Sequence, residues 1–268
     1  MKESVSQMAA IVKRALLEGG EVLRRGFPGE RRVSYKTETS PVTQVDRESE
    51  RRIINLIKRK FPAHTFLAEE SAFLKKGDLG KSRAGRYRWV IDPLDGTVNF
   101  MHRIPQSCVS VAVECAGVVL AGGVYDPFRK ELFLAVKGQG ATMNGRKIRV
   151  SKETRPIRSL LVTGFPYNHQ QRAAYHAKLL VPFLKEMADV RRFGAAALDL
   201  AWVACGRVDV YWELGLQPWD VAAGGLLVQE SGGRLTDFSG KPINLDKPEK
   251  TLATNSFLHS HALKLLSS

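Results

Sequence analysis

The sequence is poor in cysteine and contains no long apolar run, although it extends over 268 residues. No segment approaches the roughly 18 uninterrupted apolar residues that a membrane span requires. Residues 1–20 carry scattered charges and lack the apolar core and cleavage site of a signal peptide, so they predict an amphipathic helix of the mature protein. The three cysteines are dispersed without Cys-X-X-Cys spacing, which suits reduced thiols. We therefore expect a soluble, cytoplasmic protein without a membrane segment.

Acidic residues are also under-represented, with 27 Asp and Glu against 41 Lys and Arg and a formal net charge of +14. Such an excess raises the local concentration of anions, which suits a phosphate ester but equally suits nucleic acid. No nucleic-acid motif is recognisable, and no aromatic residues are interleaved with a basic stretch to form a stacking platform. Charge therefore leaves an additional role in binding RNA or a transcription complex open beside a small-molecule substrate.

Apolar periodicity predicts two helices in the first part of the chain. Residues 4–26 place apolar side chains at helical spacing, with Lys and Arg between them. A second helix is expected within 40–60, where Thr43 is placed to cap it with Asp46 three residues on. The polar stretch 74–86 predicts a mobile loop.

The rest of the chain mixes β-formers with helical stretches. Residues 108–150 contain alternating or continuous runs of β-forming residues. These runs predict an antiparallel meander, with Asn144-Gly145 as a hairpin turn. We find no repeat, linker or composition break, and we expect a single α+β domain over 1–268 with subdomains of about 1–150 and 151–268. The expected strands lie at 65–68, 87–91, 160–163, 208–212, 233–236 and 252–254, and further helices are expected at 172–187, 195–205, 219–230 and 256–266.

The segment DPLDGT, residues 92–97, places two carboxylates directly after a predicted strand. Strand ends are where open sheets bind ligands, and Pro93 lets Asp92 and Asp95 point to the same side. Gly96 lets the backbone approach a ligand closely, and the amides of Gly96 and Thr97 would form an anion site if they open a helix. Mg²⁺ takes carboxylate oxygens and keeps water and phosphate in its remaining positions. Taken alone, the hexapeptide is also compatible with an Asp-rich turn.

Two further acidic sites strengthen the metal interpretation. Glu69 and Glu70 end a short apolar run, where adjacent carboxylates repel each other unless a metal or water compensates. Asp220 stands at the start of an apolar, small-residue helix within 215–233, with Trp219 as a packing anchor. Alone, the first pair suits a solvated surface and Asp220 suits a helix N-cap. Three acidic sites of this kind in one chain are hard to explain as coincidence.

Four motifs follow one another along the chain: AEES (68–71), DPLDGTVNF (92–100), GAAALDLAWVACGRVDVYWE (194–213) and WDVAAGGLLVQESGG (219–233). Through these motifs the chain resembles the inositol monophosphatase family over nearly its whole length, and the two longer acidic motifs are highly specific. The resemblance implies a layered αβαβα sandwich of the inositol monophosphatase and fructose-1,6-bisphosphatase type, a homodimer and lithium sensitivity. It also implies an Mg²⁺-dependent phosphomonoesterase that hydrolyses inositol 1-phosphate or a similar polyol or sugar phosphate.

Carried over position by position, the resemblance assigns the site residues. It implies two Mg²⁺ ions per subunit, with a third, weaker one near Glu69. It assigns catalysis to Glu69, Asp92 and Thr97, with metal-activated water attacking the phosphorus directly and no covalent intermediate. The first metal is assigned to Glu69, Asp92 and the Leu94 carbonyl, the second to Asp92, Asp95 and Asp220, phosphate binding to Gly96 and Thr97, and the substrate pocket to Asp95, Asp220, Gly194, Ala195, Ala196 and Glu213.

One departure from the family pattern concerns the water-activating group. Many members carry an Asp three residues before the Thr of the VTxxD segment, where it is held to assist Thr97 in activating water. Here Ser40 occupies that position and Asp46 keeps the later one. The general base is therefore left open, with Glu70 or a metal-bound water as candidates.

The substrate is left open as well. The SPVT segment resembles relatives that act on 3′,5′-bisphosphonucleotides, whereas Asn99 and the region of Glu213 resemble the inositol monophosphatase branch. Fructose 1,6-bisphosphate, histidinol phosphate and 3′-phosphoadenosine 5′-phosphate are the alternative substrates on the same metal site. Arg172, Tyr175 and His176 lie in a segment that reaches either the substrate or the surface.

Overall fold

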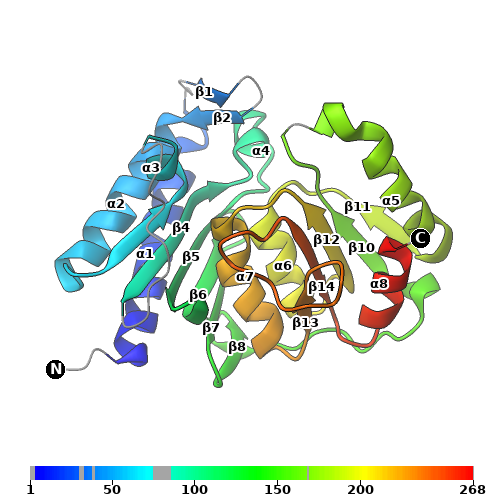
Figure 1. Ribbon diagram of the computed structural model, residues 1–268. Helices are drawn as coiled ribbons and strands as arrows, with labels where there is room; N and C mark the ends of the chain where they lie inside the picture. Colours follow the sequence, from blue (N-terminus) through cyan, green and yellow to red (C-terminus); the bar gives the residue numbers. More distant parts are fainter. Residues whose placement is uncertain (1–3, 30–32, 38–39, 75–85, 168, 268) are drawn as a thin grey trace.

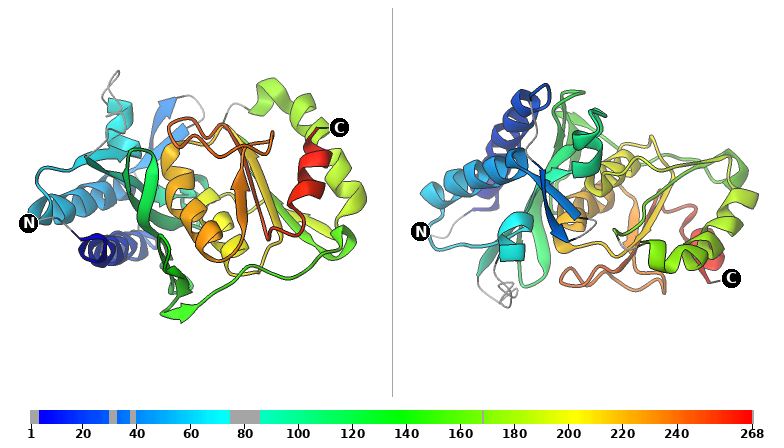
Figure 2. Two further views of the ribbon diagram at one scale, coloured as in Figure 1. Left: turned by 60° about the horizontal axis from the view of Figure 1, so that its bottom comes forward. Right: turned by 90° about the horizontal axis from the view of Figure 1, so that it is seen from above.

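The structure is a computed structural model that describes residues 4–29, 33–37, 40–74, 86–167 and 169–267. Most of the predicted loop over 74–86 lies outside the described residues. Helices and sheets alternate in five layers (Figures 1 and 2). This arrangement confirms the predicted α+β sandwich. In order, the layers are α1 (Val5–Gly26) with α2 (Gln44–Lys60), a seven-stranded sheet, α6 (Ala196–Ala204) with α7 (Pro218–Glu230), a five-stranded sheet, and α5 (Ala173–Glu186) with α8 (His259–Leu266).

The seven-stranded sheet contains the predicted meander. β3 and β4 are parallel, and every later neighbour pair in the sheet is antiparallel. Asn144 and Gly145 both have positive φ, as a tight hairpin turn requires. The strands, in sheet order, are β3 (Thr65–Ala68), β4 (Tyr87–Asp95), β5 (Cys108–Cys115), β6 (Val118–Asp126), β7 (Glu131–Val136), β8 (Gly140–Met143) and β9 (Arg146–Lys147).

The five-stranded sheet is mixed. β10 pairs in parallel with β11 and β12, whereas β14 pairs antiparallel with β12 and β13. β12 starts at Val210 rather than at the predicted 208, because the amides of Arg207 and Val208 bond back to the Trp202 carbonyl and close a turn after α6. The strands, in sheet order, are β11 (Asp189–Arg191), β10 (Leu160–Thr163), β12 (Val210–Leu214), β14 (Lys250–Thr254) and β13 (Arg234–Thr236).

Several short elements escaped the sequence analysis because they are too short to show a periodic pattern. β1 (Val33–Thr37) and β2 (Ser40–Thr43) form a hairpin that leads into α2. The second helix therefore begins at Gln44, with Thr43 and Asp46 forming the predicted capping box. Further short elements are α3 (Glu69–Leu74), α4 (Thr97–Met101) and the single 3₁₀ turns η1 (Pro156–Arg158) and η2 (His169–Arg172).

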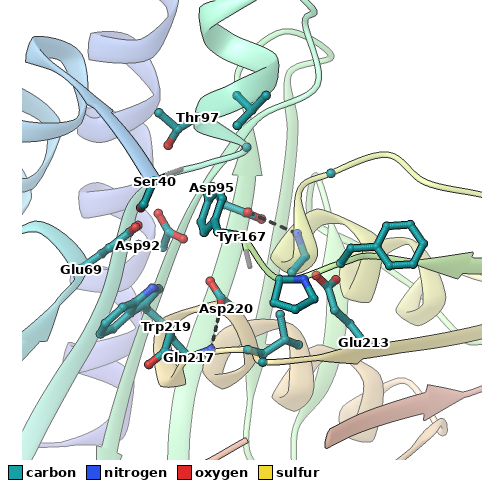
Figure 3. A pocket seen from close by; sticks show the side chains of 18 of the residues that line it. Ser40, Glu69, Asp92, Asp95, Thr97, Tyr167, Glu213, Gln217, Trp219 and Asp220 are labelled. Atoms are coloured by element: carbon teal, nitrogen blue, oxygen red, sulfur yellow. Dashed lines mark hydrogen bonds between the residues drawn. The ribbon is translucent and has the colours of Figure 1, made fainter. Parts of the chain in front are cut away.

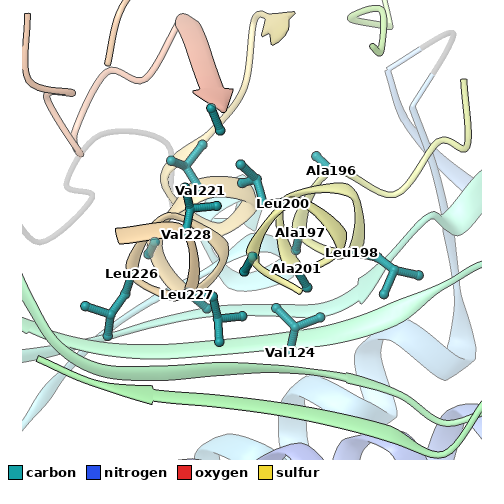
Figure 4. Close-up of a cluster of buried hydrophobic side chains, with 14 of the residues drawn as sticks. Val124, Ala196, Ala197, Leu198, Leu200, Ala201, Val221, Leu226, Leu227 and Val228 are labelled. Atoms are coloured by element: carbon teal, nitrogen blue, oxygen red, sulfur yellow. The ribbon is translucent and has the colours of Figure 1, made fainter. Parts of the chain in front are cut away.

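The central helices α6 and α7 explain the unusual apolar stretches of the second half. They are packed between the two sheets, so every face of each helix is buried against protein rather than one stripe (Figure 4). Small residues let α7 lie close to the seven-stranded sheet, since a Cβ at Gly122 of β6 would lie only 3.2 Å from the Cα of Ala223 in α7. None of the helices in the described ranges combines the length and apolar character that crossing a bilayer demands.

Candidate active site

A pocket of about 520 Å³ opens where the end of β4, the start of α4, the start of α7 and the end of β12 come together (Figure 3). It brings together residues that are far apart in the sequence. It is lined by Ser40, Glu69, Asp92, Leu94, Asp95, Gly96, Thr97, Val98, Phe165, Pro166, Tyr167, Arg192, Gly194, Ala196, Glu213, Leu214, Gly215, Leu216, Gln217, Trp219 and Asp220.

The end of β4 supplies two of the carboxylates. Residues three apart on a regular strand face opposite sides, yet Asp92 and Asp95 both line the pocket. An irregularity in the pairing with β5 lies between them, since Asp92 pairs with Ser110 and Asp95 with Cys108. The strand therefore continues through Asp95 instead of ending at residue 91 as predicted. The irregular pairing, rather than a turn, aims both carboxylates at one cavity.

Gly96 joins β4 to α4 in a conformation that few other residues adopt. Its φ is 88°, in the left-handed region, and a Cβ at this position would lie 2.8 Å from the Gln106 carbonyl oxygen. The Ser107 hydroxyl donates to the Gly96 carbonyl at 3.0 Å and holds the turn. Glycine at this position therefore lets the chain pass from Asp95 into α4, so that Thr97 opens that helix beside the pocket.

Thr97 is in contact with Asp46, which lies 51 residues earlier in the chain. The Thr97 hydroxyl lies 3.0 Å from Asp46 Oδ1 and 3.1 Å from the Leu94 carbonyl oxygen. Asp46 Oδ2 accepts from the Thr43 amide at 2.9 Å, and burial raises the pKa of Asp46 to about 6. The sequence analysis left the general base open because Ser40 carries no carboxylate, and in the structure the carboxylate in contact with Thr97 is that of Asp46. The sequence analysis had assigned Asp46 only to capping α2.

Glu69 reaches the pocket from the first residue of α3. Glu50 of α2 holds this short helix, accepting from the Glu70 amide at 2.8 Å and from the Ser71 amide at 2.9 Å. An acidic side chain suits the start of a helix, where backbone amides are unpaired and the helix dipole is positive. Glu50 therefore fixes the position of the backbone that carries Glu69.

Asp220 reaches the pocket from the first turn of α7. It is the third residue of the helix, and its Oδ2 accepts from the Gln217 amide at 2.7 Å in a capping box, so the N-cap is Gln217 and not Asp220. Burial, and next the charge of Asp95, raise the pKa of Asp220 well above its usual range. The Gln217 amide therefore holds this carboxylate in place, while the neighbouring Asp95 carboxylate disfavours its negative charge.

Asp95 is held by the start of α6. The amides of Ala196 and Ala197 donate to its two oxygens at 3.2 Å and 2.8 Å. Burial raises the pKa of Asp95 to about 6, although these amide bonds act in the opposite direction. Ala195 is buried and does not line the pocket, in contrast to the sequence-based assignment, whereas Gly194 and Ala196 do line it.

The chemistry of these carboxylates fits a hard divalent cation. Glu69, Asp92, Asp95 and Asp220 all line one cavity, and their negative charges repel one another unless a cation lies between them. In the described ranges, no three His, Cys, Asp or Glu side chains already form a group that could hold a metal. Mg²⁺ needs few protein ligands, because it keeps waters and substrate oxygens in its shell. We call these four residues the carboxylate side of the pocket.

A second set of lining residues has a different character, although one of its members, Tyr167, lies near the four carboxylates. Phe165, Pro166 and Tyr167 form an aromatic and apolar surface, with Arg192 and Glu213 as its charged groups, and we call these five residues the alcohol side. Burial raises the pKa of Glu213 to about 7. Only Glu213 of this set was expected from the sequence, since the remaining four stand in no motif. Arg172, Tyr175 and His176, which the sequence left open between the substrate and the surface, are not among the lining residues, and His176 is buried.

Comparisons with known proteins show what the whole chain is similar to. The family model described as "Inositol monophosphatase family" matches residues 4–268. The chain is 43% identical to the Nus factor SuhB of Escherichia coli K12 over 235 residues, which cover 87% of this chain and 86% of that protein. It is also 43% identical to an inositol-1-monophosphatase of Synechocystis over 225 residues, 84% of this chain and 76% of that one. The crystal structure of the extragenic suppressor protein suhB from Bartonella henselae superimposes with a TM-score of 0.90 at 36% identity, covering 98% and 99% of the two chains.

Proposed function

The chain belongs to the inositol monophosphatase family, and from this premise we propose that it is an Mg²⁺-dependent phosphomonoesterase acting on inositol 1-phosphate or a similar polyol phosphate. The observation that carries the proposal is the convergence of Glu69, Asp92, Asp95 and Asp220 on one pocket. We further propose a single domain with subdomains of about 1–150 and 151–268, both of which contribute to that pocket, and a homodimer.

The proposed metal ligands are those that the family resemblance implies, and the pocket supports them because all of these residues line it. Glu69, Asp92 and the Leu94 carbonyl would hold one Mg²⁺, and Asp92, Asp95 and Asp220 a second, with a third near Glu69. Bound divalent cations lower the pKa of a coordinated water and stabilise negative charge on phosphoryl and leaving-group oxygens. The high pKa of Asp95 and of Asp220 supports this assignment, because a cation would offset the unfavourable burial of these charges.

Thr97 and Asp46 are proposed to handle the proton of the attacking water. The Thr97 hydroxyl donates toward Asp46 Oδ1, so a lone pair of Thr97 Oγ1 stays available to accept a hydrogen bond from water. Asp46 is almost fully buried, and the Thr43 amide fixes its other oxygen. The pair therefore orients a water without large side-chain movement, as general base catalysis requires. The amides of Gly96 and Thr97 are proposed to bind the phosphate.

The alcohol side is proposed to receive the remainder of the substrate. Glu213 offers a carboxylate acceptor for a substrate hydroxyl, and Phe165 and Tyr167 offer apolar surface to the ring. Gly194 and Ala196 complete the wall without side chains that would obstruct it.

A substrate panel tests the proposal. We would measure Mg²⁺-dependent phosphate release from inositol 1-phosphate, fructose 1,6-bisphosphate, histidinol phosphate, 3′-phosphoadenosine 5′-phosphate and β-glycerophosphate. Asp92→Asn serves as the site variant, and Asp189→Asn, on exposed β11, as its matched control. Turnover that needs Mg²⁺, disappears in Asp92→Asn and persists in Asp189→Asn is expected, with inositol 1-phosphate the best substrate. A folded, Mg²⁺-saturated protein that hydrolyses none of the panel would overturn the proposal.

A second role, in binding RNA within a transcription complex, is favoured by one surface. A groove between α1 and α2 is lined by five basic side chains and one acidic one, which suits a phosphate backbone. The similar Escherichia coli protein is named a Nus factor. The Arg14→Glu and Arg59→Glu double variant is expected to weaken RNA binding and its salt dependence while phosphatase activity stays unchanged. RNA binding of equal strength by the wild type and the double variant would exclude the groove as the RNA-binding site. The lining residues are Arg14, Glu18, Arg51, Arg52, Asn55, Leu56, Lys58 and Arg59.

A further inference from the structure

Glu213 is restrained from its own strand. Tyr211 and Glu213 are two residues apart on β12, so their side chains lie on the same face of the sheet. The Tyr211 hydroxyl donates to Glu213 Oε2 at 2.8 Å, and the Tyr211 side chain is fully buried. Burial and the nearby Glu213 and Asp199 carboxylates raise the pKa of Tyr211, so its hydroxyl keeps its proton and remains a donor. One carboxylate oxygen of Glu213 is therefore committed to the protein.

Glu213 is also restrained from the neighbouring strand. Gly164 follows β10, which pairs in parallel with β12 through Thr163 and Trp212. A Cβ at Gly164 would overlap the Glu213 carboxylate group, both oxygens included. The backbone of Gly164 is not in the left-handed region, so its glycine is required by space rather than by conformation. A side chain at position 164 would therefore take the space that the Glu213 carboxylate occupies.

We propose that Gly164 and Tyr211 are positioning residues that fix Glu213 so that its free oxygen, Oε1, accepts a hydrogen bond from a hydroxyl of the substrate alcohol. This inference rests on the proposed phosphatase function, which already gives Glu213 to the substrate alcohol, and deepens it by naming the two residues that position Glu213. The favoured substrates are phosphate esters of polyols that carry a free hydroxyl near the esterified carbon. Esters without such a hydroxyl leave Oε1 of Glu213 without a hydrogen bond in a buried site. We therefore expect the site to bind these esters more weakly.

The test compares an ester that has the hydroxyl with one that lacks it. Inositol 1-phosphate and p-nitrophenyl phosphate are assayed with Tyr211→Phe and with Gly164→Ala. Each variant is expected to raise KM for inositol 1-phosphate about tenfold, the effect of displacing one charge-assisted hydrogen bond, with kcat changed less than about twofold. For p-nitrophenyl phosphate, both constants are expected to stay at their wild-type values. A merely structural role would lower kcat for both esters alike.

Matched controls separate positioning from general damage. Tyr87→Phe removes a hydroxyl at the start of β4, and Gly29→Ala adds a Cβ whose nearest neighbour is the Gly26 carbonyl oxygen at 3.6 Å. Both controls are expected to leave the KM ratio of the two esters unchanged. In a Glu213→Ala background, Tyr211→Phe and Gly164→Ala are expected to have no further effect on KM, because residues that act through one group are not additive.

The outcomes are distinguishable. A wild type that hydrolyses neither ester contradicts the proposed function itself, and the positioning role falls with it. A wild type that hydrolyses both, with a KM ratio that neither variant changes, overturns only the positioning role. Full effects of the variants in the Glu213→Ala background would overturn it as well. If Tyr211→Phe does not fold, Gly164→Ala decides alone, since the atoms it displaces are the end of the flexible Glu213 side chain.

Discussion

The two sides of the pocket are held by different kinds of groups. On the carboxylate side, backbone amides fix the acids: Asp92 accepts from Leu94, Asp95 from Ala197 and Asp220 from Gln217. On the alcohol side, Glu213 is fixed by the Tyr211 hydroxyl and by the space that Gly164 leaves. Backbone amides are present whatever the neighbouring side chains are, whereas a phenol and a missing Cβ depend on residue identity. We infer that the alcohol side is where substrate preference is set.

The largest effect is expected from Asp92→Asn, which tests whether the carboxylate side serves every substrate. We expect kcat to fall at least about 10³-fold on all esters of the panel, about 4 kcal/mol of barrier, because the residue is a proposed ligand of both metals. Steady-state kinetics at saturating Mg²⁺ provide the measurement. A loss confined to one ester would place Asp92 with the alcohol side and break the comparison.

Thr97→Val is expected to lower kcat by about 10²-fold to 10³-fold with little change in KM, since proton transfer by a positioned group contributes on that order. Thr97→Ser keeps the hydroxyl that contacts Asp46 and is expected to retain most of the activity. Equal losses in both variants would show that the methyl group matters rather than the hydroxyl.

Glu213→Gln tests the alcohol side through the pH dependence of protein stability. Burial raises the folded-state pKa of Glu213 from 4.5 to about 7, so the folded protein binds the proton more tightly and loses stability as pH rises through that range. The variant is therefore expected to be more stable than wild type by up to about 3 kcal/mol at pH 8, and by much less at pH 5. Urea unfolding at the two pH values provides the measurement. The same gain at both would contradict the burial explanation.

Asp220→Asn is expected to stabilise the metal-free protein, because burial and next the charge of Asp95 raise the pKa of Asp220 well above its usual range. The amide removes a buried charge near Asp95 yet still accepts from the Gln217 amide. Added Mg²⁺ is expected to stabilise the wild type more than the variant. Thermal unfolding with and without EDTA checks both statements, and a destabilised metal-free variant would mean that the charge contributes to folding.

Sequence reasoning reached the carboxylate side more completely than the alcohol side. Asp92 and Asp95 follow an apolar run and Asp220 opens a helix, and local patterns of this kind are visible in one dimension. The contact between Asp46 and Thr97 was missed because it joins segments 51 residues apart, although both residues were named. Tyr211 lies in the strand predicted over 208–212 and Glu213 directly follows it, so the strand period of two did offer a signal.

The remaining site residues were beyond reach from the sequence. Phe165, Pro166 and Tyr167 enter the pocket because β10 lies beside β12, and strand order in a sheet is set by packing of the whole chain. Glu50 was likewise invisible as the residue that holds α3, because this contact between helices depends on how α2 crosses the sheet.

The central claim is that the carboxylate side binds divalent cations, and its most direct test is calorimetric titration of the substrate-free protein with Mg²⁺. Wild type and Asp189→Asn are expected to bind Mg²⁺ with equal affinity, and Asp92→Asn is expected to bind at least about tenfold more weakly while unfolding at the same temperature. Binding that Asp92→Asn leaves unchanged, or no binding by the folded wild type, would contradict the account.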